Sequence, residues 1–171
     1  IVNRIVFLFV MIVMGLNQGM QPIAGYNFGA KLYGRVNKVL RLTIIYATAV
    51  TTFGFLVGML VPDLVVGIFT SDAELTELSV TGLRITVMFF PIIGFQMVTS
   101  NFFQSIGMAG KAIFLSLTRQ MLILLPCLLV LPQFFGVAGV WYSMPVSDLL
   151  ASLIALVMLV CQFRKFRTSP L

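Results

Sequence analysis

The sequence has 171 residues, of which 60% are apolar and only 9% are charged, and its formal net charge is +6. This charged fraction is far below the roughly 25% of an ordinary soluble domain, so the composition excludes a soluble globular protein. The basic residues sit mainly at the ends of apolar runs, which excludes the interleaved basic and aromatic face of a nucleic-acid-binding protein. The chain has no His, and its two Cys residues have no metal-ligand spacing, so we expect no metal and no cofactor.

Four uncharged stretches are long enough to cross a bilayer. A helix needs about 20 mostly apolar residues to span roughly 30 Å of hydrocarbon, and each stretch reaches or exceeds that length. A buried soluble core would not need such lengths, so the sequence predicts an all-α polytopic membrane protein. The stretches are residues 5–30, 42–62, 85–110 and 120–147.

Turn signals and charges divide the chain into about five transmembrane helices. Pro62-Asp63 ends the second helix, and Ser71-Asp72-Ala73-Glu74 is typical of a cap that starts the third. The third span is longer than the membrane requires, so we expect its outer end to project into water. In chain order the spans are residues 3–26, 40–61, 75–106, 112–131 and 140–163, followed by a basic tail over 164–171.

Lys and Arg residues alternate between the connections. Four follow the first span, Lys111 with Arg119 nearby follows the third, and three lie in the tail, while the connections after the second and fourth spans have none. Since Lys and Arg are retained on the cytoplasmic side, the N-terminus is predicted outside and the C-terminus in the cytoplasm. An odd number of spans with an external start is unusual for a whole transporter, and the chain begins without Met. We therefore expect a fragment with at least one span upstream.

Three ordered sequence blocks resemble the multidrug and toxic compound extrusion family, the MATE transporters. They extend over nearly the whole chain, and the set is more specific than any single block. The blocks are GLNQ at 15–18 followed by QPIAGYNFGAK at 21–31, FQSIGMAGK at 103–111, and RQ at 119–120 followed by Pro126 and by GVAGVW at 136–141.

The resemblance implies a twelve-helix protein with two six-helix lobes, of which this chain is similar to helices eight to twelve. It also implies secondary-active multidrug efflux, in which H⁺ or Na⁺ is exchanged for a drug by alternating access. The implied partners are the N-terminal lobe of the same polypeptide, the lipid bilayer, and organic cations or other small hydrophobic drugs. The implied location is the bacterial inner (plasma) membrane.

Polar side chains at membrane depth are candidates for a substrate cavity, because they are costly unless they face protein or water. The alternative is that these side chains form hydrogen bonds between helices, each contributing about 0.6–2 kcal/mol. Asn17 and Gln21 lie one turn apart and share a helix face, as do Gln96 and Ser100. The candidates are Asn17, Gln18, Gln21, Gln96, Ser100, Asn101 and Gln104.

Asp148 is the one acid well inside an apolar segment, and we treat it as a candidate for ion or proton coupling. It lies eleven residues after Val137, which corresponds to a depth of ~16 Å in a helix. Pro145 cannot hydrogen-bond the Trp141 carbonyl, so a free backbone oxygen could lie near the carboxylate. The alternatives are a structural pairing with Arg119 or Arg84, or a water-filled vestibule.

Pro91, Pro126 and Pro145 are candidate helix kinks, which could either be static or change during transport. Two other functions remain open from the residues. A lipid-linked oligosaccharide flippase of the same superfamily would need a more cationic cavity for pyrophosphate. An intramembrane enzyme is disfavoured, since the chain lacks His, HExxH and GxGD.

Overall fold

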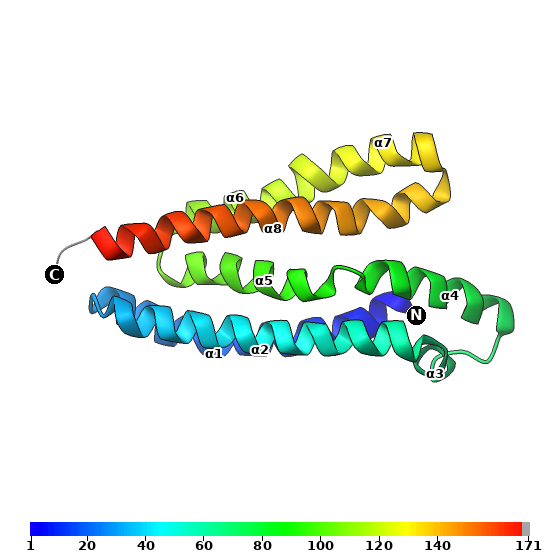
Figure 1. The fold of residues 1–171 in the computed structure, drawn as a ribbon, viewed down its shortest axis with the longest axis horizontal. Helices are drawn as coiled ribbons and strands as arrows, with labels where there is room; N and C mark the ends of the chain where they lie inside the picture. The colour runs from blue at the N-terminus through cyan, green and yellow to red at the C-terminus, as the bar shows by residue number, and fades with distance from the viewer. Residues whose placement is uncertain (169–171) are drawn as a thin grey trace.

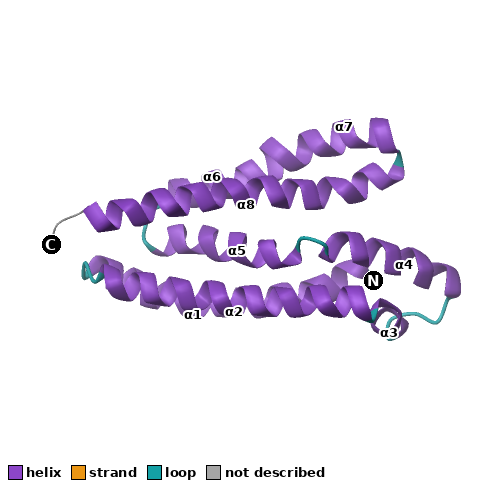
Figure 2. Cartoon of the chain, in the orientation of Figure 1, coloured by secondary structure: helices purple, strands orange, loops and turns teal. Residues whose placement is uncertain are grey.

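The computed structural model describes residues 1–168, which form helices joined by short connections (Figure 2). The all-helical prediction is confirmed. Four helices are long and apolar enough to cross a membrane, and one bent helix pair adds a fifth candidate span. The elements are α1 (Val2–Gly29), α2 (Tyr33–Leu60), α3 (Pro62–Gly67), α4 (Ala73–Val87), α5 (Phe90–Ser105), α6 (Ala109–Leu117), a π-helical segment (Thr118–Leu124), α7 (Leu125–Phe135) and α8 (Val137–Thr168).

Helix α5 lies at the centre of the bundle. Figure 1 shows it between the antiparallel pair α1 and α2 and the layer formed by α8 with α6, and it contacts all four. Its Phe90, Phe102 and Phe103 side chains are fully buried, although hydrocarbon would also accept them. The close approach of α5 to α2 requires a small residue at position 94, because a Cβ atom on Gly94 would lie 2.7 Å from Thr51 Oγ1. Two polar residues of α5, Gln96 and Thr99, are buried among the neighbouring helices.

The expected span over 75–106 is bent rather than straight. It is two helices, α4 and α5, which meet at an angle of 52°. Pro91 explains the break, because a proline removes one backbone hydrogen bond and its ring clashes with the carbonyl four residues earlier. That carbonyl belongs to Val87, the last residue of α4, and Pro91 then occupies the first turn of α5.

The other helices extend beyond the spans expected from hydropathy. α2, for example, begins at Tyr33 rather than near residue 40, because a helix continues through charged residues at the membrane surface. Pro132 lies within α7, and the turn between α7 and α8 is made by Gly136 at φ +61°. α8 runs through the basic residues of the expected tail as far as Thr168, and residues 169–171 of that tail lie outside the described part.

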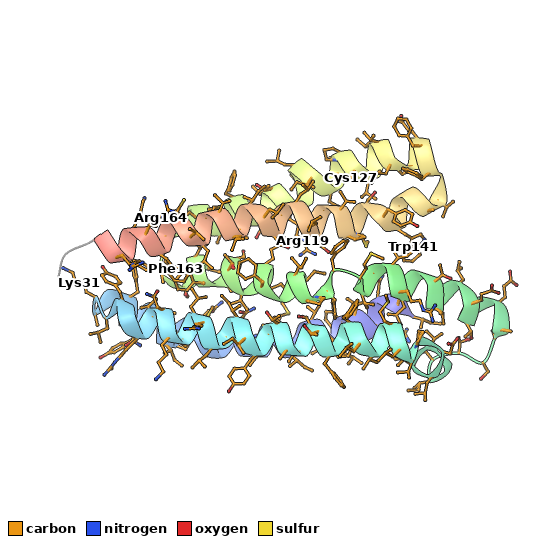
Figure 3. All side chains as sticks on the ribbon, in the orientation of Figure 1. Lys31, Arg119, Cys127, Trp141, Phe163 and Arg164 are labelled. Carbon is orange, nitrogen blue, oxygen red and sulfur yellow. The ribbon has the colours of Figure 1, made fainter. Side chains whose placement is uncertain are left out.

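Basic and acidic connections lie at opposite ends of the bundle. The α1–α2 connection, the α5–α6 connection and the C-terminal end of α8 share one end, where Lys31 and Arg164 are labelled (Figure 3). The α3–α4 connection lies at the other end, where Asp72 caps α4 by accepting hydrogen bonds from the backbone N–H groups of Glu74 and Leu75. This is the alternation that the charge pattern predicts, while the assignment of the basic end to the cytoplasm stays a prediction.

Candidate functional site

A polar groove lies between α5 and the span that faces it, α6 with the π-helical segment. Its first part has a volume of about 180 Å³. A second part of about 330 Å³ shares Ser100 and Ser116 with the first and adds Gln104. The polar residues that line the first part are Gln96, Ser100 and Asn101 from α5 and Ser116, Arg119 and Gln120 from the opposite side.

The Asn101 side chain is held in place because both the oxygen and the nitrogen of its amide form hydrogen bonds. Its Oδ1 accepts a hydrogen bond of 3.1 Å from Gln21 Nε2 on α1, and its Nδ2 donates 2.9 Å to the Met97 carbonyl. Across the groove, the Ser100 and Ser116 hydroxyl oxygens are 3.4 Å apart. These contacts order the groove wall, so a ligand would meet side chains that are already oriented.

Arg119 and Asp148 form an ion pair beside the groove. Arg119 Nε lies 2.8 Å from Asp148 Oδ1, and the two side chains are 37% and 8% exposed. The Ser147 hydroxyl donates a further bond of 3.1 Å to the Arg119 backbone carbonyl. Polar links from two neighbouring residues of α8 thus converge on one residue of the π-helical segment, whose side chain also lines the groove. Figure 3 labels this residue, Arg119, near the middle of the bundle. π-Helical segments inside α-helices occur frequently at functional sites.

The ion pair lies near the middle of the bundle's length. Arg119 is ten residues from the start of α6, and Asp148 is eleven residues from the start of α8. At 1.5 Å per residue, these positions are ~15 Å and ~16 Å from opposite ends of the two spans. Since the hydrocarbon is ~30 Å thick, both charges lie close to its midplane, where an unpaired charge is expensive.

The structure brings most of the predicted cavity residues together. Gln96, Ser100, Asn101 and Gln104 all line the groove, and Gln21 reaches it through its bond to Asn101. Neither Asn17, which is buried in α1, nor Gln18, which is exposed on α1, is among the residues that line the groove.

Among the predicted cavity residues, two buried amides have atoms without a hydrogen-bond partner in the described part of the chain. Within residues 1–168, neither Asn17 Nδ2 nor Asn17 Oδ1 has a hydrogen-bond partner, and Gln96 Oε1 has none either. A buried amide without a partner costs about 1–3 kcal/mol. Gln96 therefore carries, on the groove wall, an acceptor able to bind a donor that enters the groove.

Three groove residues were not among the predicted cavity residues. Ser116, Arg119 and Gln120 share one face of their span by the spacing i, i+3 and i+4, and this signal was available in the sequence. The charge pattern places Arg119 near the connection that ends at Lys111, whereas the structure places it inside the span, in the π-helical segment. Among the described residues, no group of three or more His, Cys, Asp or Glu side chains could hold a metal ion.

The sequence model of the MatE family matches residues 1–129. Among curated proteins, "Multidrug export protein MepA" of Staphylococcus aureus (strain MSSA476) is 26% identical over 146 residues, which are 85% of this chain and 32% of that protein. A protein of the same name from Staphylococcus saprophyticus is 22% identical over the same share. The chain thus spans about a third of the length of the curated relatives it matches.

Solved structures share the fold. The "MATE multidrug transporter DinF-BH", solved in complex with a ligand, has a TM-score of 0.88 and is 36% identical, covering 98% of this chain and 38% of that chain. The Vibrio cholerae MATE transporter VcmN in its bent form has a TM-score of 0.85 at 20% identity, covering 96% of this chain and 38% of that one.

Proposed function

We propose that this chain, which belongs to the MatE family, is part of a secondary-active multidrug exporter that exchanges H⁺ or Na⁺ for organic cations or other small hydrophobic drugs. In the proposal it supplies helices eight to twelve of a C-terminal lobe, and an N-terminal lobe of the same polypeptide completes the transport path. The relatives' names and the 36% identity to a ligand-bound multidrug transporter support this function. The basic end of the bundle faces the cytoplasm in the proposed inner-membrane topology.

The observation that carries the proposal is the polar groove with an ion pair at its side. Amides and hydroxyls at membrane depth are stable only where they face protein or water, and the groove gathers them along one face of α5. Organic cations are recognised by neutral polar groups of this kind together with aromatic and Met side chains, which are abundant in this chain.

The ion pair offers a way to couple the two fluxes. While Asp148 is charged, it neutralises Arg119 and holds the π-helical segment against α8. Binding of H⁺ or Na⁺ to the carboxylate weakens this attraction and leaves a positive guanidinium on the groove wall. That charge repels a cationic drug, so ion binding favours drug release. Pro145, three residues before Asp148 in α8, and the α4–α5 break at Pro91 are the places where the helices could bend.

The flippase alternative receives less support from the geometry. A pyrophosphate-linked substrate requires several unpaired cations, whereas the arginine that lines this groove is already paired with Asp148. The neutral amides and hydroxyls along the remaining wall fit a drug better than a pyrophosphate.

A dye-efflux assay of the complete protein, with Na⁺ and pH gradients imposed separately, tests the function. We expect efflux with one gradient and a marked loss of efflux in Asp148→Asn at unchanged protein level in the membrane. The matched control is Asp63→Asn, which changes an exposed acid in the short α3 helix and should keep normal efflux. Efflux driven by neither gradient would contradict the antiport, and normal efflux in Asp148→Asn would remove this residue from the coupling step.

A further inference from the structure

A second groove, on the surface of the bundle, lies between α2 and the C-terminal end of α8. It has a volume of about 480 Å³ and is formed at the basic end of the molecule. The ends of α2 and α8 are held together beside it, since the Tyr33 and Phe166 rings stack with their centroids 4.9 Å apart. The residues that line this surface groove are Asn37, Arg41, Ile44, Ile45, Phe163 and Arg167.

The surface groove combines two arginines with no counter-charge. Within residues 1–168, neither Arg41 nor Arg167 has an ion-pair or hydrogen-bond partner. Lys111, in the first turn of α6 at the same end, differs from these arginines because its Nζ donates to Gln162 Oε1 at 2.7 Å. Four of the chain's five acids lie in residues 63–77 at the opposite end, and the fifth is Asp148. Two planar guanidinium groups at one groove are suited to a phosphate group.

Asn37 adds a requirement for a hydrogen-bond donor. Its Oδ1 atom is buried, and no group in the described part of the chain donates to it. A phosphate oxygen cannot satisfy this acceptor, whereas a headgroup hydroxyl can. The polar end of the groove therefore fits a phosphodiester whose headgroup carries hydroxyls.

The apolar end of the groove continues along α2. A neighbouring hollow of about 570 Å³ shares Ile44 and Ile45 with the surface groove and extends to Leu56. Thr52 lies eleven residues after Arg41, which corresponds to ~16 Å along the helix and to the ~15 Å of one hydrocarbon leaflet. An acyl chain that starts at the arginines can therefore follow this surface through the whole leaflet.

We infer that the surface groove binds one anionic phospholipid of the phosphatidylglycerol type from the leaflet at the basic end. Its phosphate lies between Arg41 and Arg167, its headgroup hydroxyl donates to Asn37, and an acyl chain lies along α2. The lipid joins α2 to α8 at the end where each leaves the membrane. This binding does not depend on what the protein transports.

Native mass spectrometry of the complete purified protein can count bound lipid directly. The protein is titrated with palmitoyl-oleoyl phosphatidylglycerol, phosphatidic acid or phosphatidylcholine. We expect Arg41→Gln/Arg167→Gln to weaken phosphatidylglycerol binding about 30-fold, from the attraction of two basic residues near an anionic surface. The matched control, Lys31→Gln/Arg35→Gln, removes two charges from the same end but outside the groove. It should change the affinity less than about 3-fold, because distant exposed charges are screened.

Two further variants test the other contacts and keep the arginines. Ala49→Trp places a large ring in the apolar hollow and should abolish tight phosphatidylglycerol binding. Asn37→Leu should abolish the preference for phosphatidylglycerol over phosphatidic acid, which lacks the headgroup hydroxyls.

Three outcomes would overturn the inference. Equal losses in the two double variants would mean general attraction to a basic surface. Displacement of the lipid by millimolar inorganic phosphate would mean a free-phosphate site. Unchanged binding in Ala49→Trp would mean that no acyl chain lies along α2.

Discussion

Replacing Arg119 and replacing Asp148 should lower the free energy of unfolding by different amounts, although the two residues form one ion pair. Arg119→Gln leaves the Asp148 carboxylate, whose side chain is only 8% exposed, without its cation. Breaking a buried ion pair from one side costs about 3–5 kcal/mol. We expect a value near the lower limit, about 3 kcal/mol, because the groove beside the pair admits some water.

Asp148→Asn should cost much less. The Asn side chain retains the volume and can still accept a hydrogen bond from Arg119 Nε, and the arginine side chain is 37% exposed, so its charge can be solvated from the groove. The free energy of unfolding should then fall by about 1 kcal/mol, because one hydrogen bond loses its charged acceptor but is still formed. The double variant Arg119→Gln/Asp148→Asn should be clearly more stable than Arg119→Gln alone, since it contains no unpaired buried charge.

Denaturant unfolding of the complete protein in one detergent, followed by circular dichroism, measures these differences in the free energy of unfolding. Arg84→Gln is the control, because Arg84 is exposed on α4 and its loss should cost less than about 0.5 kcal/mol. The charge argument is refuted if Asp148→Asn is at least as destabilising as Arg119→Gln. It is also refuted if the double variant shows the full sum of the two single losses.

Two packing contacts give further predictions for the same unfolding measurement. Gly94→Ala should destabilise by about 1–3 kcal/mol, because the new Cβ would lie 2.7 Å from Thr51 Oγ1 and 3.0 Å from the Ala47 carbonyl, so α2 and α5 must separate. Gly34→Ala, whose Cβ would meet nothing within 4 Å, should leave the stability unchanged or slightly raised, and equal losses at the two glycines would contradict the packing argument. Asp72→Ala should cost about 0.5–2 kcal/mol by removing the cap of α4, whereas Asp72→Asn should retain most of the stability.

The membrane class of the protein, and the set of connections that lie at the same end of the bundle, follow from the sequence alone. Uncharged runs long enough to cross hydrocarbon predict membrane helices without any knowledge of packing, because a single helix satisfies its own backbone groups. The positions of Lys31, Lys111 and the C-terminal basic residues likewise predict which connections lie at the same end of the bundle. Each span crosses the membrane once, so every second connection returns to the same side. The ordered sequence blocks indicated the family, which the match to residues 1–129 confirmed.

Local chemistry also identified much of the groove. Gln96, Ser100, Asn101 and Gln104 were selected because amides and hydroxyls are costly in lipid, and the structure places all four along one groove. The same rule also selected Gln18, which lies outside it. Polarity shows that a side chain at membrane depth needs a hydrogen-bond partner or water. It does not show which neighbouring helix or groove the side chain faces.

Contacts between residues of different helices depend on tertiary packing. The sequence alone left open whether Asp148 pairs with Arg119 or with Arg84. In the structure α8 packs against the π-helical segment, so Asp148 pairs with Arg119, 29 residues away along the chain. Pro91 was already a candidate kink in the sequence, but the surface groove at Arg41 and Arg167 was not predicted, because hydropathy is read along one chain segment at a time. Helix register and crossing depend on interlocking side chains from several segments, such as Gly94 against Thr51, and no periodicity within a single helix contains that information.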